Sequence, residues 1–449
     1  MKHQLLQHLL LRKKLLPLVA FILLFAGFNC SSPNQNAVEL VFAFGPDESG
    51  TIQELIDRFN KENEGAIHVT WNQGSRFSDA FYSELVAEFE SGAPIFDVVG
   101  SDVIWTPAFA TNQWVEDLTQ RFFAEHEPLD FIDGAMESVS YNYKVWGLPW
   151  YTDAGMLYYR KDLLEKSGFE YPPATWSELI TVAKKVMEDS GTKNGYVFQG
   201  ADYEGGVTNA CEFIWNANGN ILVGDLYVPA SFDQESPDLD LITVNSQESR
   251  TGLTALRDLI DSGIVPENIS EFKEREGAQV FQNGDAVFMR SWASSYGYLL
   301  NPESKVKPGQ VGLTMIPTSQ RNMVPYSCLG GWNLMISSKS NAEKKEAAWK
   351  FINFMANEES QRYRAMNSGI LPSMRKLYND EKFIKEAPVV EFAKQVIPIC
   401  KERPRSPFYM EMSPEISNVY ARLVKGELEP AEAVTSLQTR LEAVLKKHQ

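Results

Sequence analysis

Val38-Glu39-Leu40-Val41-Phe42-Ala43-Phe44 is the stretch on which the fold class of this 449-residue chain depends. Its β-branched and aromatic residues predict a strand over 38–44. Apolar residues then recur every three to four positions over 51–62, which predicts an amphipathic helix. A strand over 67–71, a helix over 78–91 and a strand over 96–99 follow in the same way. This alternation indicates βαβ units, a mostly parallel sheet and the α/β class.

The alternation of strands and helices resumes further along the chain. Thr175 predicts the N-cap of a helix that runs to Met187, because Glu178 stands at the capping-box position. The other predicted elements are strands over 156–159 and 286–289 and helices over 250–262, 278–283, 343–357 and 429–447. We find no short internal repeat, which argues against a solenoid.

The size and composition of the chain are those of a globular protein with more than one domain. Hydrophobic residues make up 44% and charged residues 22% of a length that exceeds one ordinary domain. The net charge is −17, so a phosphate backbone would repel the chain. Nucleic acid is therefore not an expected partner.

The first 36 residues have the layout of a secretory signal followed by a tether. Basic residues precede an apolar run of 13 residues, Leu15 to Gly27, which is shorter than the ~20 residues that span a membrane. Cys30 stands where a lipoprotein signal places its lipidated cysteine, although Phe28 and Asn29 depart from the usual pattern. We predict a signal peptide over 1–29 and a lipid-anchored tether over 30–36. The alternative is an uncleaved membrane anchor.

The remaining cysteines do not suggest a metal site. Cys211, Cys328 and Cys400 are far apart and odd in number, so at most one disulfide can form, and buried free thiols are the preferred interpretation. The histidines after Cys30 are isolated. We expect neither a metal nor a cofactor.

Several segments, in order along nearly the whole chain after Cys30, match one family. The longest is GLPWYTDAGMLYYRKDL over 147–163, followed by PPATWSEL over 172–179. The others are SGAP over 91–94 with FDVV over 96–99, QNGDAVFM over 282–289, GGWNL over 330–334, AAWKFI over 347–352 and GILPS over 369–373. This ordered set resembles family 1 extracellular solute-binding proteins, the sugar receptors of ABC importers, and most of all their trehalose/maltose-binding branch.

The resemblance implies a two-lobed α/β periplasmic-binding-protein fold, class II-like, with the ligand between the lobes. It implies one lobe over 37–147 and 296–345 and the other over 148–295 and 346–449. It also implies a monomeric, extracytoplasmic sugar-binding protein without catalytic residues, which closes on a di- or oligosaccharide and delivers it to ABC transporter permease subunits.

Two groups of residues suit sugar recognition by their own chemistry. Sugars need flat aromatic faces for their C–H surfaces and charged or amide groups for their hydroxyls. Trp150-Tyr151-Thr152-Asp153 supplies both, with a packed turn as the alternative. Asp102 follows a predicted strand, at the end that faces the crevice of an open sheet. A helix N-cap is its alternative role.

The resemblance adds five candidate ligand-binding residues: Glu48, Trp292, Gly330, Trp332 and Arg405. Ser294 stands where some relatives carry a second aromatic residue, for which Tyr296 or Tyr298 could compensate. Trp332 could instead be plain core, and Arg405 a surface arginine. Arg76 and Gln73 are weaker candidates.

Three rival functions remain open on the sequence alone. Glu48, Asp102 and Asp153 could supply the acid and base of a secreted glycoside hydrolase, although no hydrolase motif is found. A sugar receptor that signals without transport would use the same two-lobed fold. A binder of a polyamine, a metal chelate or a peptide is the third rival.

Overall fold

The computed structural model describes residues 37–223 and 241–448. The predicted signal peptide, the lipidation site Cys30 and the tether over 30–36 lie outside the described residues. The first strand and helix match their predicted ranges to the residue: β1 is Val38–Phe44 and α1 is Thr51–Glu62. Within α1, Ile52, Leu55, Ile56 and Phe59 are buried, as the periodic pattern requires.

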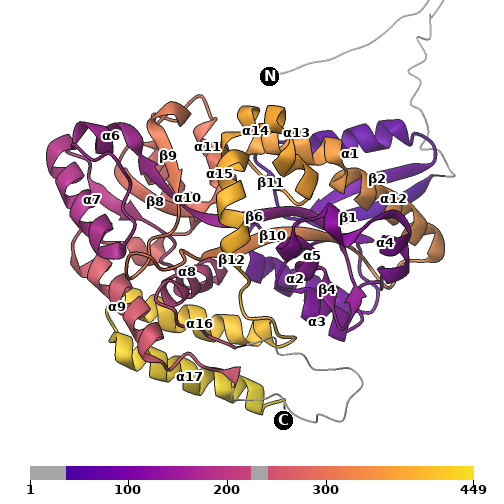
Figure 1. Ribbon diagram of the computed structural model, residues 1–449. Coiled ribbons are helices and arrows are strands. Elements are labelled where there is room, and N and C mark those ends of the chain that lie inside the picture. The colour runs from indigo at the N-terminus through magenta and orange to yellow at the C-terminus, as the bar shows by residue number, and fades with distance from the viewer. Residues whose placement is uncertain (1–36, 224–240, 449) are drawn as a thin grey trace, which may run out of the picture. The chain divides into compact units, whose positions relative to one another are not determined.

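The described chain alternates short strands with helices on both sides of a central sheet (Figure 1). Up to the long strand β6 the elements are β1, α1, β2 (Ile67–Gln73), α2 (Ser78–Glu90), β3 (Val98–Asp102), α3 (Thr106–Thr111), α4 (Thr119–Glu125), α5 (Asp133–Ser138), β4 (Ser140–Tyr141), β5 (Lys144–Val145) and β6 (Leu148–Arg160). From there to α11 they are α6 (Lys161–Lys166), α7 (Trp176–Ser190), β7 (Asn194–Val197), α8 (Glu204–Trp215), α9 (Gln247–Asp261), α10 (Glu274–Gln282), β8 (Ala286–Trp292) and α11 (Tyr296–Leu299). The last ones are β9 (Val311–Thr314), β10 (Ser327–Ile336), α12 (Ala342–Ala356), α13 (Glu358–Ser368), β11 (Leu371–Pro372), α14 (Glu381–Glu386), α15 (Pro388–Val396), β12 (Cys400–Lys401), α16 (Tyr409–Val424) and α17 (Pro430–Lys446).

The main sheet is mixed, with the order β2-β1-β3-β10-β6-β8-β7. Parallel pairing holds for β1 with β2 and β3 and for β7 with β8, as the βαβ pattern predicts. In the middle, β10 runs antiparallel to both β3 and β6, and β6 runs antiparallel to β8. The prediction of a mostly parallel sheet is therefore wrong for its centre: β10, which was not predicted as a strand, inserts antiparallel between β3 and β6, and β8 also runs antiparallel to β6.

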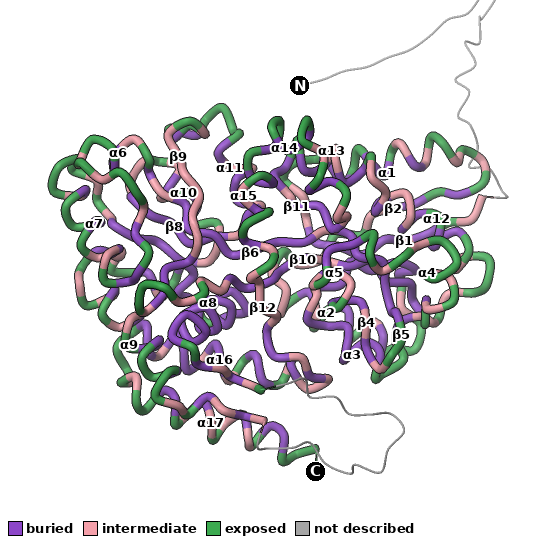
Figure 2. The backbone as a smooth tube through the Cα atoms, viewed as in Figure 1, coloured by how far each residue is buried: buried purple, intermediate pink, exposed green. Residues whose placement is uncertain are grey.

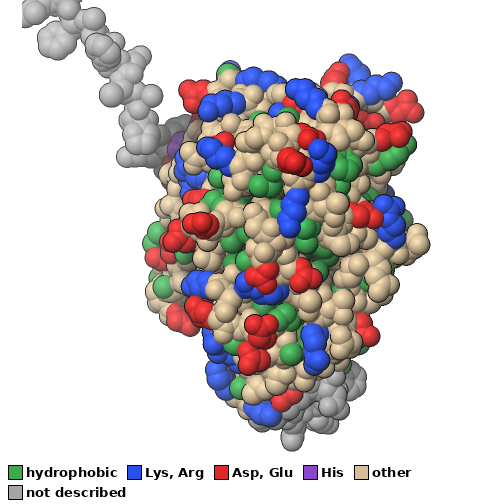
Figure 3. All heavy atoms as spheres, turned by 90° about the vertical axis from the view of Figure 1, so that its left-hand side faces the viewer, with side chains coloured by type: hydrophobic (Ala, Val, Ile, Leu, Met, Phe, Trp, Pro, Cys, Tyr) green, Lys and Arg blue, Asp and Glu red, His purple; other side chains and the backbone are tan. Residues whose placement is uncertain are grey.

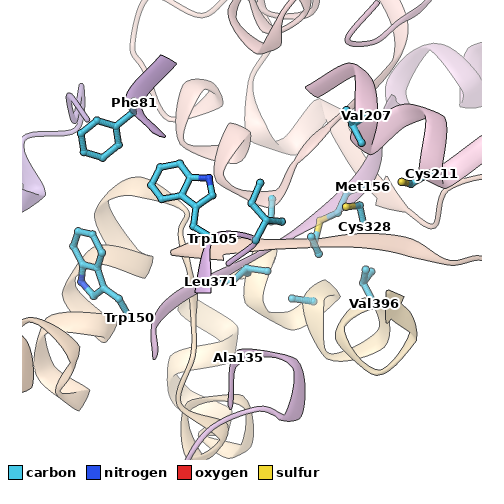
Figure 4. Packing of buried hydrophobic residues seen from close by; sticks show 14 of the residues in the cluster. Phe81, Trp105, Ala135, Trp150, Met156, Val207, Cys211, Cys328, Leu371 and Val396 are labelled. Carbon is cyan, nitrogen blue, oxygen red and sulfur yellow. The ribbon is translucent and has the colours of Figure 1, made fainter. Parts of the chain in front are cut away.

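Two sides of the molecule meet along β6 and β10 (Figure 1). We call them the β1–β3 side, where α1 and α12 pack against β1, β2 and β10, and the β7–β8 side, where α7 and α10 pack against β7 and β8 and α8 packs against α9 and α16. The buried residues run through both sides (Figure 2). Trp105, Trp150 and Met156 (the latter two of β6) and Cys328 of β10 belong to one continuous buried cluster (Figure 4).

The predicted lobe boundaries stay a prediction. The packing of α12 against β1 argues for a boundary later than residue 345, because Phe351 contacts Phe42 and Phe59 with ring centroids 5.4 and 5.2 Å apart. The pairing of β9 with Leu157–Arg160 places residues 311–314 beside β6 on the β7–β8 side.

Candidate ligand-binding site

Two adjoining cavities, of about 320 and 570 Å³, open between the two sides of the molecule. We call them the inner and outer cavity. The rings of Tyr151, Trp292 and Trp332 line both. The inner cavity takes further residues from the end of β3 and from the starts of α8 and α10, so both sides of the molecule contribute to it. Each cavity has the size of a typical small-ligand site.

Asp153 is a buried carboxylate on the wall of the inner cavity. It lies on β6, and its Oδ1 accepts hydrogen bonds from the backbone N–H groups of Ala154 (2.9 Å) and Ser294 (3.3 Å). Burial raises the pKa of Asp153 to about 6, although hydrogen bonds from Ser294 and Ala154 oppose the rise. A ligand hydroxyl would be a further donor to this carboxylate.

Asp102 ends β3 and is paired rather than free. Its Oδ2 accepts from Ser78 Oγ at 2.7 Å, and its Oδ1 lies 3.2 Å from Arg403 Nη2. The same guanidinium donates to Glu204 Oε1 at 2.6 Å, and Glu204 also accepts from Tyr409 and Ser413. Arg403 thus joins β3 of one side to α8 of the other, while its buried Nε has no partner in the described chain.

The aromatic residues of the site are held by close packing. Trp332 meets Phe44 and Trp105 edge-on, with ring centroids 4.9 and 5.2 Å away. A Cβ on Gly330 would lie 2.7 Å from the ring of Trp292, so glycine is needed for that ring to sit where it does. Gly331 has a φ of +132° and would place a Cβ 2.5 Å from the carbonyl oxygen of Tyr151.

Glu48 lines the outer cavity and carries two ion pairs. Its Oε1 lies 2.9 Å from Arg76 Nη1 and 3.6 Å from Arg275 Nη1. Arg76 precedes α2 and Arg275 lies in α10, so Glu48 links the two sides across the mouth of the site.

The structure brings seven of the eight predicted ligand-binding residues to these cavities: Glu48, Asp102, Tyr151, Asp153, Trp292, Gly330 and Trp332. Arg405 lies elsewhere. It lines a separate pocket of about 90 Å³ beside Trp215 and donates to the carbonyl oxygen of Ser140. Arg403, two residues earlier in the same Arg-Pro-Arg motif, lines both that pocket and the inner cavity. Of the weaker candidates, Arg76 lines both cavities, whereas Gln73 ends β2 and lines neither.

Sequence reasoning missed several further residues of the site, among them Glu204, Arg364 and Tyr203. Glu204 begins α8 and is buried, and Arg364 of α13 lies with its guanidinium carbon 4.6 Å from the centroid of the Tyr151 ring. Tyr203 also lines the inner cavity. The sequence Glu-Gly-Gly over 204–206 could have indicated Glu204 as a site residue. No pattern in the sequence indicates Arg364, because an arginine inside a polar helix ordinarily faces solvent.

The three cysteines of the described chain, Cys211, Cys328 and Cys400, line neither cavity. Cys211, Cys328 and Cys400 are free thiols, and burial raises the pKa of each. Over residues 37–223 and 241–448, no cluster of three or more His, Cys, Asp or Glu is placed to hold a metal ion.

The chain matches an established family over most of its length. Residues 45–362 match the family described as bacterial extracellular solute-binding protein. This protein belongs to that family. Its cleft between two sides of an α/β fold is the site expected of a solute-binding protein, and the family consists of binding proteins rather than enzymes.

Relatives of this solute-binding protein serve ABC transporters. A probable ABC transporter-binding protein of Deinococcus radiodurans is 28% identical over 415 residues, covering 90% of this chain and 93% of the relative. The protein is therefore a solute-binding component of an ABC transporter with an extracytoplasmic location. In the part of the chain that the structure describes, no helix is long and apolar enough to span a membrane.

Solved structures share the two-lobed fold. Maltose-bound MalE3 of T. maritima is 32% identical, has a TM-score of 0.82, and the match covers 91% of this chain and all of that one. A solute-binding protein of Thermotoga lettingae bound with alpha-D-tagatose has a TM-score of 0.76 at 24% identity, over 91% of this chain and all of that one, and shows the fold alone.

Proposed function

We propose that this solute-binding protein captures a di- or oligosaccharide between its two lobes, closes on it, and delivers it to the permease while anchored by a lipid on Cys30. The observation that carries the sugar proposal is that three aromatic residues and two carboxylates line the same cleft. Tyr151, Trp292 and Trp332 offer flat faces for C–H surfaces, and Asp102, Asp153 and Arg403 offer strong partners for hydroxyls.

The size of the site supports a ligand longer than one ring. The inner and outer cavities adjoin at the same three aromatic residues, so one extended ligand could occupy both. A relative of 32% identity was solved with maltose, a disaccharide, which agrees with this length.

The electrostatics of the aromatic walls argue against a polyamine. The guanidinium carbon of Arg290 lies 4.6 Å from the centroid of the Trp292 ring, and that of Arg364 lies 4.6 Å from the centroid of the Tyr151 ring. Each ring therefore already carries a cation against its π system, which disfavours a cationic ligand beside it. A neutral, hydroxyl-rich ligand meets no such repulsion.

A glycoside hydrolase finds little support in the carboxylates. Two of the three carboxylates considered for acid–base chemistry are held in ion pairs, Asp102 with Arg403 and Glu48 with Arg76 and Arg275. Incubation of the purified protein with each sugar that binds, followed by chromatography of the products, tests this point; cleavage would contradict the binding-only proposal.

Thermal-shift screening against mono-, di- and trisaccharides tests the sugar proposal. A ligand at about 100 times its dissociation constant adds about 2.7 kcal/mol to the stability of the folded state. We expect a rise with a di- or trisaccharide, lost in Trp332→Ala and kept in the control Trp114→Ala, whose ring lies outside both cavities. No rise across the panel would reject a sugar ligand.

Membrane fractionation tests the anchor separately. We expect the wild-type protein in the membrane fraction and Cys30→Ala in the soluble extracytoplasmic fraction. Retention of Cys30→Ala in the membrane would reject lipid anchoring and favour an uncleaved anchor.

A further inference from the structure

A fully buried ion pair lies directly behind the aromatic wall of the site. Arg290 of β8 donates through Nε to Glu212 Oε2 at 2.7 Å and through Nη2 to Glu212 Oε1 at 2.6 Å, with side chains only 1% and 2% exposed. Arg290 Nη1 reaches Gln199 Oε1 at 3.2 Å, and Glu212 Oε1 also accepts the backbone N–H of Cys328 at 3.0 Å. The pair therefore ties together α8, β8 and β10.

Stability alone is a weak reason for such a pair. Removing two charges from water costs several kcal/mol per ion, so a hydrophobic pair of similar volume often serves as well or better. Arg290 is also too deeply buried to touch a ligand in either cavity. Any effect of Arg290 on ligand binding must therefore be transmitted by a neighbouring residue that does line a cavity.

The neighbour is Trp292. Arg290 and Trp292 are two residues apart on β8, so their side chains leave the same face of the strand. The guanidinium carbon lies 4.6 Å from the centroid of the Trp292 ring. Tyr158 fixes the backbone at the same place by donating its hydroxyl to the carbonyl oxygen of Trp292 at 2.8 Å.

The facing strand makes room for this arrangement. Gly155 of β6 is the register partner of Trp292. A Cβ at Gly155 would lie 2.0 Å from Glu212 Oε1 and 2.7 Å from Arg290 Nη2, so only glycine admits the ion pair beside that tryptophan. Gly330 leaves space for the ring in the same way from β10, where a Cβ would lie 2.7 Å from it.

We infer that Arg290, oriented by Glu212, is a positioning residue for Trp292: the buried guanidinium supports the indole ring so that the ring is presented to the ligand in one orientation. This inference rests on the proposed sugar-binding function for its binding readout. A planar guanidinium held at two points by a carboxylate is suited to this role, because its own orientation is fixed. The cation–π contact then favours one placement of the indole.

A double-mutant cycle on sugar affinity tests the inference. Arg290→Lys keeps a charge for Glu212 but loses the flat guanidinium, and we expect it to weaken binding about tenfold, the equivalent of about 1.4 kcal/mol. In a Trp292→Ala background the same substitution should have no further effect, because its route to the ligand is gone. Equal losses in both backgrounds would overturn the inference.

Two comparisons separate positioning from folding. Arg160→Lys, a matched change at another largely buried arginine with a carboxylate partner, Asp162, should leave affinity unchanged. Arg290→Met combined with Glu212→Gln removes both charges together, which avoids an unpaired buried charge. This variant should keep a cooperative unfolding transition and still bind weakly; binding as tight as wild type would overturn the inference.

A ligand-free readout keeps the inference independent of the sugar proposal. The difference in tryptophan fluorescence between each protein and its Trp292→Ala partner isolates the signal of Trp292. We expect acrylamide to quench this signal more strongly in Arg290→Lys than in wild type, because the ring is no longer held. Identical quenching would refute positioning by Arg290, whereas the absence of binding to any sugar would refute only the proposed function.

Discussion

At the scale of single residues, Asp153 lines the inner cavity, and burial of its carboxylate charge lowers the stability of the folded state. Its burial raises its pKa to about 6, whereas an aspartate in an unfolded chain titrates near ~3.9. Between about pH 4 and pH 6 the folded state therefore holds the proton more tightly than the unfolded state. The contribution of Asp153 to the stability of the folded state is therefore favourable at low pH and is lost as the pH rises through about 6.

Asp153→Asn should consequently stabilise the protein, and more so at neutral pH. At pH 7.5 we expect a gain of about 1–3 kcal/mol over wild type, shrinking towards zero near pH 4, because each pKa unit is worth about 1.4 kcal/mol. Urea denaturation at several pH values measures this difference. Sugar affinity should fall at the same time, as expected where a site residue is maintained at a cost in stability. A stability difference that does not vary with pH would contradict the role of burial.

A site residue could be predicted where neighbouring residues in the sequence indicate its role, and could not where its role depends on residues far away in the sequence. Tyr151 and Asp153 stand in one continuous motif, which places a ring and a carboxylate together before any fold is known. Arg403 and Arg405 share a motif too, but only tertiary packing decides which guanidinium reaches Asp102 and Glu204. The two ion pairs of Glu48 were likewise beyond prediction, because its partners lie 28 and 227 residues away in sequence.

At the scale of elements, the starts of three helices meet across the mouth of the site. Phe77 precedes α2 on the β1–β3 side, and Tyr203 and Lys273 precede α8 and α10 on the other. Lys273 Nζ lies 3.6 Å from the centroid of the Phe77 ring and 4.8 Å from that of Tyr203, and the two rings meet edge-on at 6.2 Å. These contacts connect the two sides at the site.

Lys273→Met should therefore weaken ligand binding in a protein that still folds. A cation–π contact of this kind is worth about 0.5–2 kcal/mol, so we expect the dissociation constant to rise by a few-fold up to about thirtyfold. Calorimetry measures the affinity, and urea unfolding checks that the variant keeps one cooperative transition. Lys305→Met, at a lysine that lines neither cavity, is the control. Unchanged affinity would show that the contact does not contribute to closure.

Elements were predictable where one face of a helix or strand is buried. The amphipathic pattern of α1 and the β-branched and aromatic residues of β1 predicted their ends to the residue. In contrast, all twelve residues of α8 are buried, so no periodic contrast exists to reveal it. The strand β10 was missed because Gly330-Gly331 and its polar residues lower its β-propensity, and only pairing with β3 and β6 makes it a strand.

At the scale of the whole molecule, the mixed sheet and one buried arginine join the two sides. The sheet is continuous through β10 and β6, so we expect the two sides to unfold together rather than separately. Over the side of the molecule that carries α6, α7 and α9, acidic and basic side chains are interspersed (Figure 3). Besides the exposed ion pairs of Glu48, a buried charge network links the two sides, with Arg403 between Asp102 of β3 and Glu204 of α8.

Arg403→Met should destabilise the protein by an amount that depends on pH. It leaves Asp102 and Glu204 buried without their cation, which should destabilise the protein by about 3–5 kcal/mol at pH 8. Burial already raises the pKa of Glu204 against the attraction of Arg403, so removal of the arginine should raise it further. The loss should therefore shrink as the pH falls towards 5 and Glu204 takes up a proton.

The neighbouring arginine is the natural control for this experiment. Arg405→Met removes a hydrogen bond to the carbonyl oxygen of Ser140 and a 3.7 Å contact with Glu402, both outside the two cavities. We expect it to leave sugar affinity unchanged, whereas Arg403→Met should lower it at least tenfold, since the arginine whose guanidinium reaches the inner cavity also joins the two sides. Loss of affinity in Arg405→Met with affinity kept in Arg403→Met would contradict this assignment. The ligand would then be bound through Arg405, beside the separate pocket, and not in the inner cavity.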